Sequence, residues 1–172
     1  TAEAVPIAGF VAPNDVDTEY EDLYRHGLRR GLSTGWADVD RYYTVVPGYL
    51  TLITGIPAAG KTELLDNLMI NMAVRHDWRF AAFSPESWPH AEHLSRWAEK
   101  YLGQPFFDGP HLRMSWDQAL AAKRWAHEHL RFLDPDVPSL DAILDLAKVE
   151  LRRFGINALT IDPWNEVEDD AG

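Results

Sequence analysis

The chain has 172 residues and a mass of 19.5 kDa, the size of one ordinary domain or a piece of a larger one. Apolar residues make up 46% and charged residues 25%, which argues against disorder and against a fibrous repeat. The net charge of −11 argues against a protein whose whole surface binds nucleic acid, although it does not exclude a local basic groove. Because there is no cysteine, disulfides, Cys-based zinc sites and a thiol nucleophile are excluded.

The N-terminal third combines an irregular arm with one short helix and one strand. Residues 1–20 contain prolines and acids without an apolar period, whereas residues 20–30 place acids early and arginines late, as a helix dipole favours. Gly31 is the expected stop of this helix. After the turn residues Pro47 and Gly48, the apolar run at 49–55 predicts a buried strand.

From residue 60 onward helices and strands alternate. The pattern predicts helices at 60–75, 90–102, 115–129 and 139–154, and strands at 79–84, 131–133 and 158–162. Ser115 and Gln118 have the spacing of a capping box, which strengthens the start of the third helix, and Ser139 is the expected cap of the fourth. Such alternation requires crossover connections, so we expect an α/β fold with a parallel sheet covered on both faces. No apolar run approaches the roughly 18 residues that span a bilayer, and we expect no membrane partner.

Residues 55–62 read Gly-Ile-Pro-Ala-Ala-Gly-Lys-Thr and match the glycine-rich phosphate loop, between a predicted strand and a predicted helix. In such a loop successive N–H groups point at phosphate oxygens, and the helix N-terminus adds partial positive charge. The alternative is a chance match in a strand–turn–helix connection. We expect ATP and Mg²⁺ as ligands, with Lys61 on the β- and γ-phosphates and Thr62 on magnesium. The residues expected to contact nucleotide are Gly55, Pro57, Ala58, Ala59, Gly60, Lys61, Thr62 and Asp162.

Two further carboxylates complete the expected site. The run Ala-Leu-Thr-Ile ends in Asp162, an acid at a strand end where magnesium needs a partner, although acids also begin ordinary loops. Pro163 occupies the next position, so the group that orients the attacking water must lie elsewhere. We favour Glu86, just past the strand at 79–84, over Glu63, which the helix turns toward solvent, and over Glu166.

Tryptophan and histidine are both abundant enough to suggest a binding role. Most of the seven tryptophans fall within or beside predicted elements, so core and edge packing is the better interpretation. His90 and His93 are one helical turn apart, but a zinc site needs a better-spaced third ligand. We therefore expect them to be exposed histidines near a helix end.

Several ordered motifs together resemble a known family, over about residues 30–168. These are Ser33-Thr34-Gly35-Trp36 with Asp40, Pro47-Gly48, the loop at 55–62, Phe83-Ser84-Pro85-Glu86, and Ile161-Asp162-Pro163-Trp164-Asn165-Glu166. The set is similar to the RecA-like motor domain of DnaB-type replicative helicases, and most similar to phage primase-helicases and Twinkle-like helicases.

The resemblance implies a partial RecA-like P-loop NTPase domain at 31–172, preceded by a linker arm with a short helix at 1–30. By the same resemblance, Lys61 and Glu86 are catalytic, Thr62 and Asp162 hold the metal, and Asp162 is the second acidic motif of the site. The family couples ATP hydrolysis to translocation on single-stranded DNA as a homo-oligomeric, typically hexameric, ring. A cytoplasmic location in bacterial or phage replication machinery is the corresponding expectation.

The chain stops at Gly172, soon after Asp162. In the family the following strands carry a γ-phosphate sensor, the DNA-binding loops and an arginine finger, so these residues alone are not expected to unwind DNA. Two alternatives stay open. One is a truncated, non-catalytic P-loop interaction module, and the other is a small-molecule kinase built on the same loop.

Overall fold

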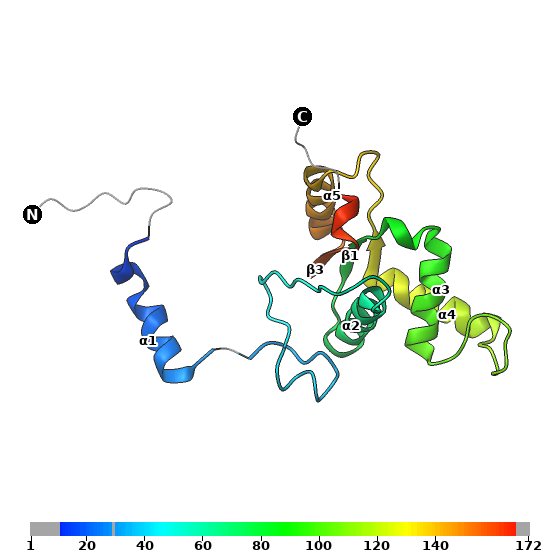
Figure 1. Ribbon diagram of the computed structural model, residues 1–172, viewed down its shortest axis with the longest axis horizontal. Helices are drawn as coiled ribbons and strands as arrows, with labels where there is room; N and C mark the ends of the chain where they lie inside the picture. The colour runs from blue at the N-terminus through cyan, green and yellow to red at the C-terminus, as the bar shows by residue number, and fades with distance from the viewer. Residues whose placement is uncertain (1–10, 29, 168–172) are drawn as a thin grey trace, which may run out of the picture. The chain divides into compact units, whose positions relative to one another are not determined.

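The computed structural model describes residues 11–28 and 30–167 (Figure 1). The chain divides into two compact units, residues 1–31 and residues 32–172.

The described part of the first unit is helical. The 3-10 helix η1 (Pro13–Val16) leads into α1 (Asp17–His26), which carries acids in its first turn and Arg25 and His26 in its last, as the helix dipole favours. Gly27 ends α1 at φ 71°, four residues before the expected stop at Gly31, and its N–H donates to the Leu23 carbonyl. A left-handed φ at the first glycine after the helix is what ends it.

The second unit is built on a parallel sheet. Its strands β1 (Phe80–Phe83), β2 (Leu130–Phe132) and β3 (Ala158–Ile161) lie in the order β2-β1-β3, with Phe80 opposite both Leu130 and Ala158. Four helices accompany the strands: α2 (Lys61–His76), α3 (His90–Leu102), α4 (Trp116–His129) and α5 (Leu140–Arg153). The short 3-10 helices η2 (Pro85–Ser87) and η3 (Trp164–Glu166) follow β1 and β3. The expected α/β architecture with a parallel sheet is confirmed.

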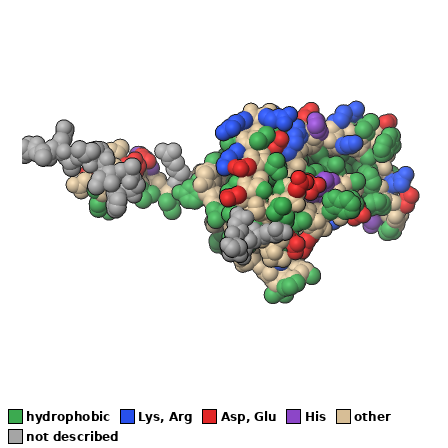
Figure 2. Space-filling model, turned by 90° about the horizontal axis from the view of Figure 1, so that it is seen from above, with side chains coloured by type: hydrophobic (Ala, Val, Ile, Leu, Met, Phe, Trp, Pro, Cys, Tyr) green, Lys and Arg blue, Asp and Glu red, His purple; other side chains and the backbone are tan. Residues whose placement is uncertain are grey.

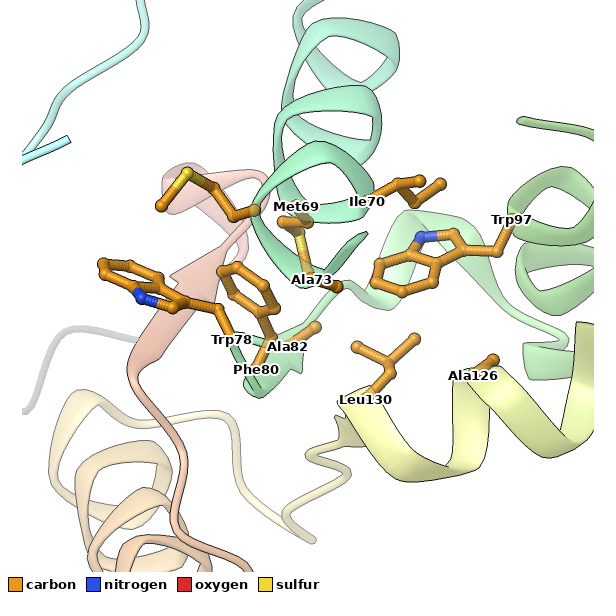
Figure 3. Close-up of a cluster of buried hydrophobic side chains, with 10 residues drawn as sticks. Met69, Ile70, Ala73, Trp78, Phe80, Ala82, Trp97, Ala126 and Leu130 are labelled. Atoms are coloured by element: carbon orange, nitrogen blue, oxygen red, sulfur yellow. The ribbon is translucent and has the colours of Figure 1, made fainter. Parts of the chain in front are cut away.

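The sheet is covered on both faces, because alternate residues of β1 enter different clusters. Phe80 and Ala82 pack with Met69, Ile70 and Met72 of α2, with Trp97 of α3 and with Leu130 (Figure 3). Ala81 and Phe83 pack instead with Ile143 and Ala147 of α5. All four residues of β1 are buried, which explains why this central strand is continuously apolar.

Two helices begin at caps that the sequence predicts. The Ser115 hydroxyl accepts a hydrogen bond from the Gln118 N–H at 3.2 Å, and the Gln118 side chain accepts one from the Ser115 N–H at 2.8 Å. Ser139 caps α5 by accepting from the Ala142 N–H at 3.2 Å. These caps satisfy N–H groups that the first turn leaves unpaired.

The predicted strand at 49–55 is wrong. No residue of this run joins the sheet described for residues 32–167, and Leu50 and Leu52 are 96% and 77% exposed. Only Ile53 is half-buried. An apolar run becomes a strand only where a neighbouring strand accepts its backbone hydrogen bonds, and these residues have no such neighbour among residues 11–28 and 30–167.

The segment before the run is attached to α2. The Asn71 side chain donates to the Thr34 carbonyl at 2.9 Å, and the His76 ring lies 2.9 Å from the Ser33 carbonyl. Gly35 has φ +90°, and a Cβ there would lie 2.8 Å from side-chain atoms of Asn71 and Arg75. Glycine is therefore required at this close approach.

Hydrophobic side chains are exposed across the visible face of the second unit, between groups of acidic and basic ones (Figure 2). Leu112, Trp116 and Trp164 are among the large apolar residues that remain exposed. Within residues 11–28 and 30–167, no helix combines the length and apolar character needed to cross a membrane.

Candidate functional site

The direction of α2 places its N-terminus toward the edge at which the parallel strands end. At its other end, the Trp78 N–H donates to the Met72 carbonyl just before β1 begins, and near its start Asp66 lies 2.9 Å from His93, in the helix that follows β1. Helix and strand therefore run in opposite directions. Sixteen helical residues span about 24 Å, whereas the four residues of β1 span about 13 Å. The first turn of α2, with Lys61 and Thr62, therefore lies toward the carboxyl ends of the strands.

Two predicted carboxylates occupy this same edge. The Asp162 N–H donates to the Phe83 carbonyl at 3.0 Å, which extends the pairing of β1 and β3 by one residue. Glu86 follows Phe83 by three residues, in the exposed turn η2, and the Asp162 side chain is half-buried. Parallel strands thus bring Glu86 and Asp162 to one edge although 75 residues separate them.

The phosphate loop has a defined backbone although the run before it is not a strand. Gly60 has φ 82° and leads directly into α2, and Ala58 also has a positive φ of 60°. The Ala59 N–H donates to the Ile56 carbonyl at 3.2 Å. The Lys61 ammonium donates to the carbonyls of Gly55 and Ile56, at 3.2 Å each. The loop thus curls around the lysine that the motif assigns to phosphate.

The donor groups at this edge fit a nucleotide with magnesium. The loop supplies backbone N–H groups, a helix N-terminus and the Lys61 ammonium, all of which favour an anion. Thr62 and Asp162 supply a hydroxyl and a carboxylate, oxygen ligands of the kind that Mg²⁺ prefers. Gly60 needs its left-handed backbone but has nothing within 4 Å of a Cβ position, so conformation rather than space requires glycine there.

Glu63 and Glu166, the alternatives to Glu86, have different surroundings. Glu63 is 61% exposed, as expected, and pairs with Lys100 at 3.1 Å. Glu166 is exposed in η3, where its carboxylate lies 3.4 Å from the Asn165 amide.

The structure corrects the expectation that His93 is exposed. Its side chain is 2% exposed and its Nε2 donates to Asp66 Oδ1 at 2.9 Å. Trp97 Nε1 donates to the same oxygen at 3.1 Å, and Lys100 Nζ lies 3.4 Å from Oδ2. Burial by itself would raise the pKa of Asp66, but hydrogen bonds from His93 and Trp97 and the nearby charges hold this pKa below its usual value.

A second carboxylate, Asp40, fixes the segment attached to α2. It accepts hydrogen bonds from the Ser33 hydroxyl and from both the N–H and the hydroxyl of Thr34. These bonds lower the pKa of Asp40. The motif of residues 33–36 with Asp40 is recognisable in the sequence, and its donors Ser33 and Thr34 belong to it. Asp66 is missed because its donors lie on another helix; only the i, i+4, i+7 spacing of His93, Trp97 and Lys100 indicates a shared face.

Comparison with known proteins decides the relationship. The chain is 37% identical, over 176 aligned residues, to the Twinkle homolog protein, chloroplastic/mitochondrial, of Arabidopsis thaliana. The alignment covers 97% of this chain. The chain is a relative of the Twinkle-like helicases. The resemblance drawn from the motifs is thereby confirmed, and the sheet with its flanking helices is that of a partial RecA-like P-loop domain.

The chain spans 25% of the length of this Twinkle relative. No protein-family model and no solved structure matches the chain. The expected cytoplasmic location in bacterial or phage replication machinery is wrong, because the matched Twinkle protein is named as chloroplastic/mitochondrial.

Proposed function

We propose that residues 31–172 are the ATP-binding and hydrolysing core of a replicative DNA helicase of the primase-helicase type. In the complete protein this core couples ATP hydrolysis to movement on single-stranded DNA, within a homo-oligomeric, hexameric ring. The observation that carries the proposal is that three motifs lie toward the same edge of the sheet: the phosphate loop at the start of α2, Glu86 after β1, and Asp162 after β3. Residues 1–30 serve as the linker arm.

Each residue has a distinct role in this proposal. The N–H groups of residues 55–62 and the Lys61 ammonium bind the phosphates, and the ammonium leaves its loop carbonyls when nucleotide enters. Thr62 and Asp162 hold Mg²⁺, which neutralises charge on the transferred phosphoryl group. Glu86 is exposed at the strand end and orients and polarises the attacking water.

The test is DNA-stimulated ATP hydrolysis by the complete protein. We expect Lys61→Ala to abolish hydrolysis by weakening nucleotide binding, and Glu86→Gln to lower kcat by about 10²- to 10⁴-fold while ATP still binds. Glu166→Gln is the matched control, because it makes the same change at an exposed glutamate of the same edge. Hydrolysis that survives both Lys61→Ala and Glu86→Gln would overturn the site assignment.

The same assay separates the alternatives. Nucleotide binding without hydrolysis in the complete wild-type protein would favour a non-catalytic interaction module. Transfer of the γ-phosphate to a small molecule rather than to water would favour a kinase.

A further inference from the structure

The buried carboxylate of Asp66 lies between the two elements that carry the proposed catalytic groups. Asp66 is one helical turn after Thr62 on α2, and His93 is in the first turn of α3, which begins three residues after η2. The Asp66–His93 hydrogen bond of 2.9 Å thus links the start of the phosphate-loop helix to the start of the helix that follows Glu86.

Three donors from one face of α3 converge on this carboxylate. They are the His93 ring, the Trp97 indole and the Lys100 ammonium, at 2.9, 3.1 and 3.4 Å. Figure 3 shows Trp97 reaching from α3 toward Ile70 on α2. Asp66, His93 and Trp97 are 2%, 2% and 0% exposed, so water does not replace a lost partner.

The histidine has no substitute partner. Its second ring nitrogen, Nδ1, is buried without a hydrogen bond to any residue in the described part of the chain. Loss of the Asp66 carboxylate would therefore leave the His93 ring with no hydrogen bond and would release the first turn of α3.

We infer that Asp66 is a positioning residue, which acts through His93 and α3 to hold the Glu86 turn against the phosphate loop. This inference rests on the proposed ATPase function for its catalytic consequence. The structural role of Asp66 in holding the Glu86 turn is argued from contacts alone: α3 contacts both η2 and α2, and Ser87 within the turn is buried. A merely stabilising cluster would lower the melting temperature without changing kcat at temperatures far below it.

The experiment uses Asp66→Leu in the complete protein, with two readouts. Leucine accepts no hydrogen bond, so the His93 ring and the Trp97 indole both lose their acceptor. Hydrogen exchange of the Ser87 and Trp88 amides, which now donate to Ser84 and Pro85, should rise about tenfold. ATP hydrolysis should show kcat lowered about tenfold with KM changed less than about twofold, because the phosphate loop is intact. Asp145→Leu, at a 74% exposed position of α5, is the matched control and should change neither the exchange nor kcat.

A second pair of variants covers failure of Asp66→Leu to fold. His93→Gln keeps a donor for Asp66 and should retain wild-type exchange and kcat, whereas His93→Leu removes the donor and should reproduce the Asp66→Leu effect. Equal behaviour of His93→Gln and His93→Leu, or unchanged exchange at residues 87–88 in Asp66→Leu, would overturn the inference. Wild-type protein that hydrolyses no ATP would overturn the proposed function instead, and the exchange data would still decide the role of Asp66.

Discussion

The two halves of the candidate site are held in different ways. The sheet-edge half, with Glu86 and Asp162, follows strands whose central member is entirely buried and whose last pairing is made by the Asp162 N–H. The loop half follows a run in which Leu50 is 96% exposed, and its shape depends on Gly60 and on the Lys61 ammonium. Tertiary burial therefore positions the carboxylates, whereas local backbone chemistry shapes the phosphate loop.

The largest expected effect concerns the core beneath the sheet edge. Trp97 is fully buried, so Trp97→Ala should lower the free energy of unfolding by about 3–5 kcal/mol, through lost burial and a cavity. Trp164 is 60% exposed, and Trp164→Ala should change the free energy of unfolding by less than about 0.5 kcal/mol. Urea unfolding of both variants measures the difference, and equal losses would contradict the burial assigned to the two residues.

An intermediate effect is expected where the segment before the loop meets α2. Gly35→Ala adds a Cβ at φ +90° that meets Asn71 and Arg75 side-chain atoms at 2.8 Å, so it should cost about 2 kcal/mol. Gly48→Ala makes the same change at φ +83° in open space and should cost about 1 kcal/mol. Thermal unfolding of the two variants measures both losses of stability. A smaller loss for Gly35→Ala than for Gly48→Ala would show that the 33–36 segment does not pack on α2 as described.

A smaller effect tests how strongly local capping fixes an element. Ser115→Ala removes the side-chain acceptor of the Gln118 N–H and should lower stability by about 1 kcal/mol. Ser115→Asp keeps an acceptor at the cap and should stay within about 0.5 kcal/mol of wild type. Chemical denaturation provides the measurement, and an Ala variant as stable as the Asp variant would rule out a stabilising cap.

A further effect on stability, from Asp66, is expected only at low pH. The pKa of Asp66 is lower in the folded than in the unfolded chain, so its stabilising contribution is present above the ordinary value of 3.8 and is lost as pH falls below it. Unfolding free energy measured from pH 6 to pH 3 should fall less steeply in Asp66→Asn than in wild type. A steeper fall in the variant would mean that folding raises the pKa of Asp66, which contradicts the direction given above.

The smallest effect is expected in the run before the phosphate loop. Leu52 is 77% exposed, so Leu52→Ala should alter stability by less than about 0.5 kcal/mol. Met69→Ala, at a 2% exposed position of α2, should cost about 2–5 kcal/mol. A loss for Leu52→Ala comparable with that for Met69→Ala would show that residues 49–55 are a buried strand after all.

Most elements between residues 61 and 161 could be predicted because their signals are local. Amphipathic spacing, the Ser115 and Ser139 caps and continuous apolar strands mark them, and the observed bounds lie within one or two residues of those expected. Two features could not be predicted. The run at 49–55 has strand composition, but a strand also needs a neighbour, which composition does not reveal. His93 has a polar side chain, and its burial depends on Asp66, 27 residues away.

The same distinction between local signals and contacts across segments applies to the candidate site. The loop motif and the strand-end acids could be found from spacing, because each is a short pattern next to an apolar run. Their meeting at one edge follows from parallel pairing, which alternating elements predict. The Asp66 cluster depends on contact between two helices, and no pattern within one segment specifies it.

The central claim is that the loop and the sheet edge form one magnesium–nucleotide site, and a double-mutant cycle tests it most directly. Magnesium-dependent ATP binding by the complete protein would be measured for Thr62→Ala, Asp162→Asn and the double variant. If both residues hold one ion, the double variant should bind about as weakly as the weaker single variant, with a coupling of about 1 kcal/mol or more. Losses that simply add would contradict a shared site.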